Sequence, residues 1–586
     1  MKIKALYPML LLLAAAMMPS CSSDSPAPAV GGGDEAAGYL QLAVTTDTPT
    51  RANPTGGEEG DGLEHGRDKE NTIHNLNVFL YYPNADGLDG NQRVVWSRYV
   101  DSQTTDGIIP EYPIDRIYNV NIPLGEADMD VFGMSKDRFM RILVVANAGN
   151  LTKLVEGGVS VRGIADYTAY GNAWTVGGDG IQANSDYFVM SSAFNGVKRS
   201  DRYSRDGLII PGDRIYTSEV NLERVAARID LEVAENQLVD FNYGGENVGE
   251  NGGENVGKGL KYDIKEADHY LTITDIIPVN LMQQNSYLLK QVTEGTDLGG
   301  NMNAVSRFVA GDEKTDAAGL PTNYVISPSF LSIFNNPAIN NATYFGDTSS
   351  ANLRANYEAV IGSGRYRIDR FGGLLNIPTD SWGNTNANKA LLVTYSNENT
   401  VHEKFQMSNG GESEGENGGA NGWKASDYIT GLLFRAQYHP AKVYTAEDGW
   451  NPDASRAYTD GEDFWLFRTV EGETKESKNL YFASEAALNA YVATLPAGGE
   501  YETQYYPGGI CYYNIWVKHA NIDREPNATE QNFPMKYGIV RNNIYRISLS
   551  FNGIGEPTPE ITEPYNVTSR IFVVKWNFRP QPEIIM

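Results

Sequence analysis

The chain has 586 residues, 41% of them hydrophobic, which is room for about two to four globular domains with substantial cores. Its formal net charge of −27 would repel the phosphates of nucleic acids and anionic lipid surfaces, so the composition argues against a nucleic-acid partner. With 60 Gly, 35 Tyr and few long helix-forming stretches, the expected fold class is all-β with long loops.

Residues 1–20 have the pattern of a bacterial lipoprotein signal peptide. A basic start with Lys2 and Lys4 precedes an apolar run over Met9–Met18, and Cys21 follows shortly after. The apolar run is too short to span a bilayer. We therefore expect an exported, outer-membrane lipoprotein precursor in which the lipid on Cys21 is the only membrane anchor.

Residues 21–51 are predicted to be a propeptide that carries a removable first strand. After a Gly-rich tether, Tyr39–Thr46 shows the partial apolar alternation of a half-buried strand. Arg51 follows in a segment rich in Pro and Gly, which is expected to be exposed and easily cut. An ordinary linker residue is the alternative for Arg51, and Arg67 is the second candidate cleavage site. The strand residues expected to be displaced by cleavage are Tyr39, Leu40, Leu42 and Val44.

Residues 52–216 are expected to form an N-terminal β-sandwich and residues 217–552 a C-terminal one. Apolar centres or alternation predict strands over residues 71–82, 138–147, 186–190, 220–233, 510–517 and 544–551. Two stretches, Gly244–Gly259 and Gly410–Gly422, are predicted to be solvated loops because their composition cannot bury enough apolar area. Ser484 is expected to cap a helix over Glu485–Leu495, and a second helical pattern lies around Leu353, Tyr357 and Val360.

Residues 553–586 are predicted to be a linker followed by a terminal strand. Three prolines in Gly553–Tyr565 favour an extended connection, and Ser569–Phe578 is strongly β-prone. This strand could fold back as an edge strand of its own domain or add to another copy of the protein, and periodicity does not separate the two.

The first and last strands of the chain are expected to act together in assembly. Removing the first strand would expose backbone groups and an apolar groove, which soluble proteins normally avoid. The terminal strand of a neighbouring copy could fill this groove, and such a head-to-tail contact, if it does not close on itself, produces a filament. The candidate donor residues are Ile571, Val573, Val574, Trp576 and Phe578.

Several motifs resemble those of the fimbrillins of Bacteroidales type V pili, most closely the major shaft subunit of short, Mfa-type fimbriae. The resemblance rests on the lipoprotein signal, the Arg51 site and the terminal strand with Trp576, and on the segments 142–149, 188–191, 224–227 and 538–545. It spans nearly the whole chain, although the segment from Gly244 to Trp465 shows no match.

The resemblance implies two transthyretin-like β-sandwich domains completed by strand exchange. It also implies maturation by an arginine-specific protease at Arg51, displacement of Tyr39–Thr46 and donation of Ile571–Phe578. The implied partners are other copies of the chain and accessory tip and anchor subunits, and the implied location is a cell-surface fimbria that supports adhesion.

The sequence gives little support for catalysis or for a cofactor. The six histidines show no paired metal-ligand spacing, and no Ser lies in a nucleophile elbow. Gly252–Gly259 comes close to a phosphate-binding loop, but Gly259 stands where the Ser or Thr hydroxyl is needed. Cys511 is interpreted as a small core residue rather than a nucleophile.

One acidic cluster could hold calcium but lacks the loop spacing of a calcium site, so a solvated acidic loop is the preferred interpretation. Its members are Asp448, Asp453, Asp460, Glu462 and Asp463.

Two other functions stay open at this point. A tip or anchor subunit of the same fimbria would lack the donor strand or the cleavage site. A glycan-binding surface lipoprotein would stay monomeric and retain its lipid, and the many Tyr residues could line a sugar-binding surface, although in an all-β chain they usually pack between strands.

Overall fold

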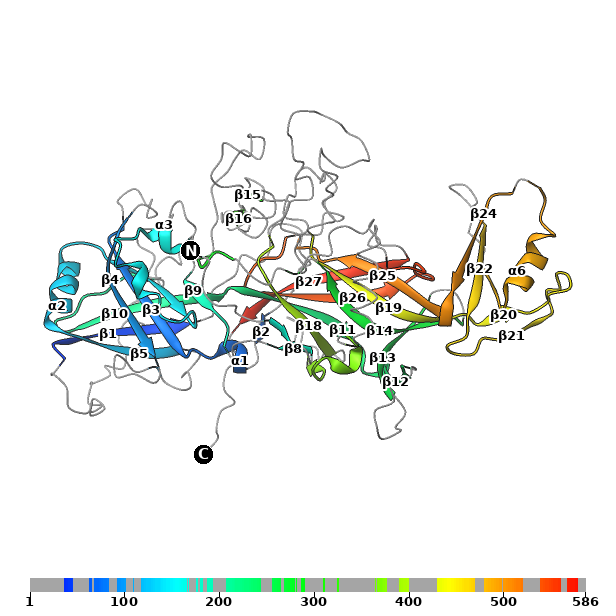
Figure 1. The fold of residues 1–586 in the computed structure, drawn as a ribbon. Coiled ribbons are helices and arrows are strands. Elements are labelled where there is room, and N and C mark those ends of the chain that lie inside the picture. The colour runs from blue at the N-terminus through cyan, green and yellow to red at the C-terminus, as the bar shows by residue number, and fades with distance from the viewer. Residues whose placement is uncertain are drawn as a thin grey trace, which may run out of the picture.

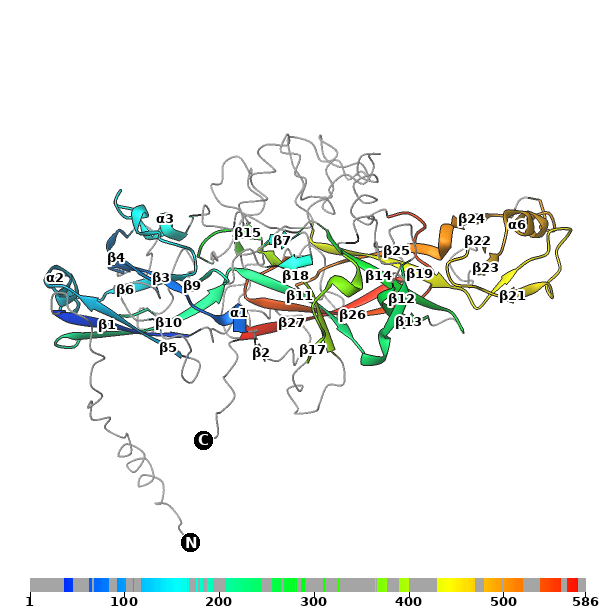
Figure 2. The same ribbon diagram turned by 60° about the horizontal axis from the view of Figure 1, so that its bottom comes forward.

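The protein is an elongated row of three β-rich bodies (Figures 1 and 2). An N-terminal β-sandwich lies at one end, a C-terminal β-sandwich lies in the middle, and a smaller lobe lies at the other end. The computed structural model describes residues 36–45, 63–65, 68–83, 92–101, 109, 117–165, 167, 175–177, 180–182, 187–192, 207–243, 256–264, 268–279, 281, 286–289, 309–310, 324–325, 364, 366–376, 389–399, 429–469, 479–497, 499–519, 538–559 and 566–577. The expected all-β fold class is confirmed, since strands make up most of the regular structure in these ranges.

The N-terminal sandwich is one seven-stranded sheet that folds over on itself. In spatial order its strands are β4 (Val94–Asp101), β3 (Asn75–Tyr81), β6 (Arg141–Ala146), β9 (Met190–Ser192), β10 (Ile215–Arg224), β1 (Gly38–Thr45) and β5 (Ile117–Leu124). Strand β10 pairs with β1 along its first part and with β9 along its last three residues, so it belongs to both layers. Fully buried side chains from both layers, including Leu42, Val78 and Ile122, meet in one core. Helix α2 (Glu126–Gly133) adds Phe132 to that core.

The C-terminal sandwich consists of two sheets around the largest core. One sheet has the order β17 (Leu375–Asn376), β18 (Lys389–Asn397), β11 (Ala226–Val233), β26 (Asn543–Phe551), β27 (Val567–Asn577) and β2 (Leu63–His65). The other has the order β12 (Leu238–Asn242), β13 (Val256–Asp263), β14 (Tyr270–Val279), β19 (Gly431–His439) and β25 (Ile510–Trp516). Inward side chains such as Ile229, Phe434 and Ile547 come from both sheets.

The smaller lobe is inserted at the tip of the β19–β25 hairpin. Its sheet has the order β21 (Ser455–Ala457), β20 (Lys442–Tyr444), β23 (Asn479–Phe482), β22 (Phe464–Thr469) and β24 (Tyr501–Tyr506), and helix α6 (Glu485–Val492) covers one face. The other face of the sheet contributes Phe464, Leu466 and Tyr506 to the core of the large sandwich. The lobe therefore packs on the C-terminal sandwich and shares its core.

The remaining elements are short. They are helices α1 (Asp68–Asn71) and α3 (Val161–Ala165), the strand pairs β7 (Thr175–Gly177) with β8 (Gly180–Gln182) and β15 (Val309–Ala310) with β16 (Tyr324–Val325), and the 3-10 turns Met134–Lys136, Thr152–Leu154, Glu235–Gln237, Ile368–Arg370 and Pro507–Gly509.

Most of the predicted strands are found near their expected positions, but three predictions are corrected. The continuous strand predicted over residues 220–233 is two strands in different sheets, β10 and β11, which separate at Val225. The strand predicted over residues 186–190 overlaps β9 only at Met190. The loop predicted over Gly244–Gly259 ends earlier, because β13 begins at Val256 and pairs with β12.

The predicted helix is confirmed as α6. The Ser484 hydroxyl accepts a hydrogen bond of 3.1 Å from the backbone N–H of Ala487, which is the expected N-terminal cap. The helical pattern around Leu353 and the loop Gly410–Gly422 lie outside the described residues.

Cys511 lies in β25 and is fully buried, and burial raises the pKa of its thiol to about 12. Both properties keep the thiol protonated and out of reach of solvent. We expect a thiol-alkylating reagent at pH 8 to leave Cys511 unmodified in the folded protein and to modify it fully in denaturant, as measured by mass spectrometry. Rapid alkylation under native conditions would contradict this packing.

Candidate functional site

The central feature of the N-terminal sandwich is that its first strand is an inner strand. Strand β1 runs parallel to β10, from Tyr39 opposite Ile215 to Thr45 opposite Asn221. On its other side β1 runs antiparallel to β5 over all eight residues. Among the described strands β5 pairs with β1 alone. Removing β1 would thus open a slot between β10 and β5 and leave β5 without a sheet partner.

Alternate residues of β1 face the core, as its sequence pattern predicts. Leu40, Leu42 and Val44 have 0%, 1% and 0% of their surface exposed, whereas Tyr39 is half-buried and Gln41 is exposed. Burial of each of the three apolar side chains contributes about 2 kcal/mol. Strand β1 is therefore stabilised by its buried side chains, and its removal would expose an apolar groove.

The start of β1 is fitted closely to its surroundings at Gly38. The Tyr39 backbone N–H donates to the carbonyl of Arg214 at 2.8 Å, and the Ala37 N–H donates to the carbonyl of Leu124 at 2.9 Å. A Cβ atom on Gly38 would lie 2.4 Å from Sδ of Met129 and 2.6 Å from the Arg214 carbonyl oxygen. Only glycine lets the strand enter between β10 and β5 at this point.

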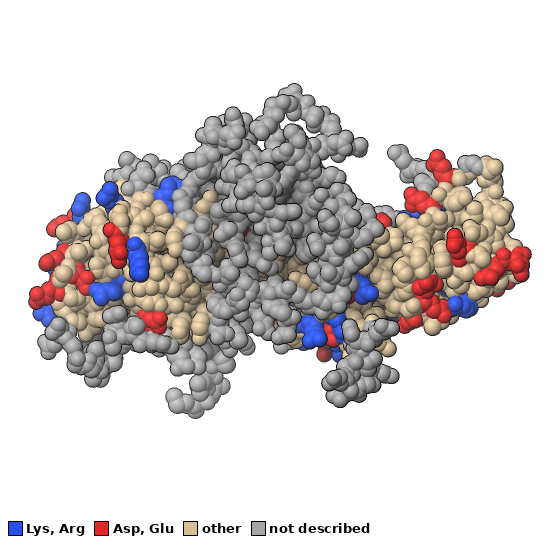
Figure 3. Space-filling model, in the orientation of Figure 1, with Lys and Arg blue, Asp and Glu red and all other residues tan. Residues whose placement is uncertain are grey.

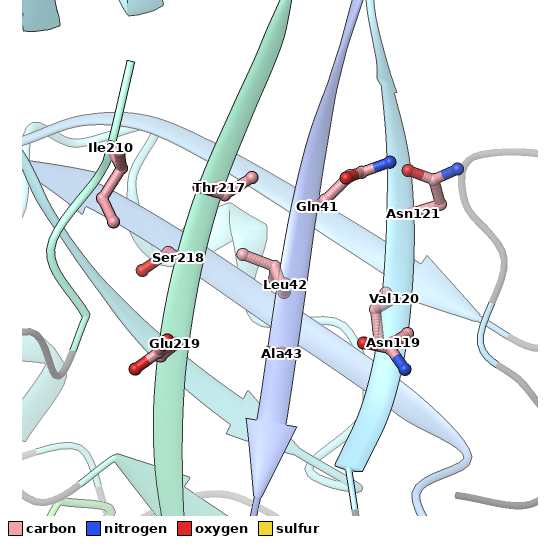
Figure 4. Close-up of a pocket in the computed structure, with 10 residues that line it drawn as sticks. All are labelled: Gln41, Leu42, Ala43, Asn119, Val120, Asn121, Ile210, Thr217, Ser218 and Glu219. Atoms are coloured by element: carbon pink, nitrogen blue, oxygen red, sulfur yellow. The ribbon is translucent and has the colours of Figure 1, made fainter. Parts of the chain in front are cut away.

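A pocket of about 410 Å³ lies over the three strands (Figure 4). Strand β1 runs through the middle of the lining, between β10 and β5. The lining combines polar and apolar surface and consists of Gln41, Leu42, Ala43, Asn119, Val120, Asn121, Ile210, Thr217, Ser218 and Glu219. A strand that replaced β1 would complete the same lining.

The terminal strand β27 is paired within its own chain. It runs antiparallel to β26, from Val567 opposite Phe551 to Lys575 opposite Asn543. Ile571 is half-buried and packs against the core of the C-terminal sandwich. Of the two arrangements that the sequence allowed, this structure contains the intramolecular one, and donation to a neighbour stays a prediction.

The connection between β26 and β27 is anchored at its beginning. The backbones of Tyr512 and Glu556 exchange hydrogen bonds of 2.8 and 2.9 Å. The Tyr513 hydroxyl donates to the carbonyl of Gly553 at 2.9 Å, and Ile554 is fully buried. The first part of the predicted linker is thus packed on β25. This anchored segment, here called the root of β27, lies on the lobe side of the sandwich.

A buried polar network joins the two sandwiches at the point where β10 passes into β11. Arg228 forms ion pairs with Asp230 at 2.6 Å and with Glu70 at 3.3 Å, and all three side chains are fully buried. The Tyr395 hydroxyl also donates to Glu70. Although burial opposes the charge on Arg228, the carboxylates of Asp230 and Glu70 hold its pKa above the ordinary value.

Arg224 extends the same network to helix α1 and to the segment before β26. Its guanidinium donates to the Glu70 carbonyl at 2.8 Å, to the side chain of Asn71, and to Oδ1 of Asn542 at 2.9 Å. Asn542 has a φ of 58°, in the left-handed region that Asn tolerates better than most residues. Two of the segments that carry the fimbrillin resemblance, 224–227 and 538–545, therefore meet at this junction.

Sequence reasoning missed the network as a unit. The available signal was the presence of Arg224, Arg228 and Asp230 in an otherwise apolar strand pattern. Their partners Glu70 and Asn542 are far away in the sequence, and no local pattern marks them.

The other predicted site residues are only partly described. Cys21 and Arg51 lie outside the described residues, as does Phe578. The backbones of Val573, Val574 and Trp576 lie in β27, and their side chains are not described.

The acidic cluster of the lobe is engaged in structural contacts. Asp460 pairs with Nδ1 of His439 at 2.8 Å, Glu462 pairs with Arg456 at 2.7 Å, and Asp463 accepts from the backbone N–H of Gly508 at 2.8 Å. In Figure 3, Asp and Glu side chains gather on the visible surface of the lobe. Within the described ranges, no three His, Cys, Asp or Glu side chains group as metal ligands would. In the same ranges, no helix has the length and apolarity needed to cross a membrane.

Residues 504–579 match the family model described as "Major fimbrial subunit protein type IV, Fimbrillin, C-terminal". The match covers β25, β26 and the terminal strand β27. The predicted resemblance to fimbrillins is thereby confirmed, and residues 504–579 are similar to the C-terminal region of this family.

Two solved structures are similar over most of their length. A fimbrilin (fimA) from Porphyromonas gingivalis W83 is 15% identical, with 93% of this chain and 99% of that chain covered at a TM-score of 0.31. The tip fimbrial protein Mfa3 from Porphyromonas gingivalis, with C-terminal truncation, is 10% identical, with 92% and 99% covered at a TM-score of 0.30. No curated protein matches the chain significantly.

Replacing Gly38 tests how closely β1 is held. We expect Gly38→Val to destabilise the N-terminal sandwich of the precursor by about 1–3 kcal/mol, because the added side chain overlaps Met129 and the Arg214 carbonyl. Gln41→Val, at an exposed position of the same strand, is the matched control and should change stability by less than about 0.5 kcal/mol. Denaturant unfolding of both precursors measures the difference, and equal stabilities would show that β1 is not seated as described.

Replacing Asp230 tests the buried junction. We expect Asp230→Ala to lower the free energy of unfolding by about 3–5 kcal/mol, because Arg228 would lose the closest of its buried partners. Asp240→Ala is the control, since Asp240 pairs with Lys258 on the surface and such pairs contribute about 0–1 kcal/mol. Similar losses in the two variants, measured by denaturant unfolding, would contradict a structural role for the network.

Proposed function

We propose that this protein is a structural pilin, the major shaft subunit of a cell-surface fimbria. In this proposal, arginine-specific proteolysis at Arg51 removes β1, and the terminal strand of a neighbouring subunit takes its place between β10 and β5. The observation that supports it most directly is that β1, which precedes Arg51, is an inner strand of its sandwich and, among the strands that the structure describes, the one partner of β5.

The slot and the proposed donor match in length and pattern. Strand β1 fills the slot with eight residues, and β27 offers eleven. In β1 the buried apolar residues occupy every second position. The terminal segment has the same spacing in Phe572, Val574, Trp576 and Phe578, so one face of an extended donor would be apolar throughout.

The positions of slot and donor favour an open polymer. The slot lies in the sandwich at one end of the molecule, while the root of β27 is anchored to β25 on the side toward the lobe (Figure 1). A strand that swings out from this root points away from its own slot. Repeated donation then joins different surfaces of successive copies, which is a heterologous contact and builds a filament.

The two ends also distinguish the shaft from the other fimbrial roles. A tip subunit needs a slot but no donor, and an anchor needs neither a usable cleavage site nor a free donor. This chain has an inner first strand, an arginine after it and a terminal strand, and this combination favours the shaft role. Export as a precursor lipidated on Cys21, partnership with tip and anchor subunits and adhesion through the polymer belong to the same proposal.

The experiment is site-directed cross-linking between subunits. One population of cleaved subunits carries Asn121→Cys on β5, beside Gln41 of the departing strand. A second population carries one cysteine at each position from Phe572 to Phe578 in turn. We expect disulfide-linked heterodimers to form after cleavage at Arg51, with a yield that alternates along the donor at every second position.

Val95→Cys, at an exposed position of the distant edge strand β4, is the control acceptor and should give no such pattern. Buried Cys511 will not compete. Absence of cross-linking at every donor position, with monomers persisting after cleavage, would overturn the proposal. Retention of the lipid on Cys21 in such a monomer, together with binding on a glycan array, would instead support a glycan-binding surface lipoprotein.

A further inference from the structure

We propose that β2 (Leu63–His65) is a latch that holds the terminal strand in its own subunit and slows its release for donation. The inference rests on the proposed function, in which β27 is the donor. It adds a regulatory contact made by the segment between the predicted cleavage site and helix α1.

The last residues of β27 are held from both sides. Lys575 lies opposite Asn543 of β26 in an antiparallel ladder and opposite Leu63 of β2 in a parallel one. The β2 ladder continues with Glu64 opposite Trp576 and His65 opposite Asn577. Without β2 this end of β27 would be an exposed edge of the sheet. If β27 separates from β26 starting at its C-terminal end, its pairing with β2 must break first.

The position of β2 is enforced by its neighbour in the chain. Helix α1 starts at Asp68, and its last two residues, Glu70 and Asn71, are buried in the network with Arg224 and Arg228. Because β2 is joined by a short connection to the fixed helix α1, it stays at a high local concentration beside β27. In both views of the fold, α1 and β2 lie next to the end of β27 (Figures 1 and 2).

Proteolysis changes the freedom of the latch. In the precursor the chain that carries β2 is joined to β1 on one side and to α1 on the other. After a cut at Arg51 it is a tail fixed only at α1, so opening the β2 ladder releases more conformational freedom than before. A cut at Arg67 would sever β2 from α1 altogether. Cleavage at Arg51 would thus leave a mature subunit in which β2 still holds β27. Cleavage at Arg67 would leave a mature subunit without this contact.

The test compares polymerisation rates of full-length precursors cut at Arg51. In Leu63→Pro/Glu64→Pro the β2 ladder loses backbone donors, because proline has no N–H. The matched control is Glu58→Pro/Glu59→Pro, upstream of β2. We expect SDS-resistant polymer to appear about tenfold faster from the first variant than from the control, since only a few hydrogen bonds are removed.

A reversible lock completes the design. In Leu63→Cys/Lys575→Cys the paired positions can form a disulfide, while Cys511 is buried and Cys21 leaves with the propeptide. The oxidised, cut subunit should stay monomeric, and a thiol reductant should restore polymerisation.

The outcomes separate the latch from the strand exchange itself. Equal rates for the two proline variants would overturn the latch, while the proposed function would stand if the oxidised lock still blocked assembly. Polymer formed by the oxidised subunit would overturn both, because residue 575 would then be tied to its own chain during assembly.

Discussion

The organisation of this protein depends on the pairing of β1 with β5. Strand β5 has no other partner among the described strands, and β1 fills the space between β5 and β10 with Leu40, Leu42 and Val44. Strand β1 is an inner strand of its sheet, and Arg51, the predicted cleavage site, follows it in the sequence. Removal of β1 would create both a row of unpaired backbone groups and an apolar groove, and a strand from another molecule would satisfy both at once.

In the proposed strand exchange, β27 has two alternative positions, one in its own subunit and one in a neighbouring subunit. In the monomer β27 is held by β26 along nine paired residues and by β2 at its end. In the polymer it would have β5 on one side and β10 on the other, with its apolar face buried. The buried network around Arg224 and Arg228 fixes α1 against the body, and would keep β2 in place during the proposed release of β27.

Sequence patterns predicted what depends on local periodicity. The alternation of Leu40, Leu42 and Val44 located β1 and its buried face, and Ser484 located the start of α6. The break at Val225 was hidden because the apolar pattern continues from β10 into β11 without a turn residue. The lobe was missed because its inner face shares the core of the large sandwich through Phe464 and Tyr506. Glu70 and Asn542 could not be predicted as partners of Arg228 and Arg224, because they are far away in the sequence and converge with them only through the fold.

Hydrogen exchange of the β5 amides within Ile117–Leu124 whose N–H groups point toward β1 tests the central claim most directly. The account predicts strong protection in the precursor, loss of protection in the cleaved monomer after the propeptide has been removed, and renewed protection in the polymer. Protection that persists in the cleaved monomer would show that β5 does not depend on β1. Amides that stay unprotected in the polymer would show that no strand from a neighbour occupies the slot.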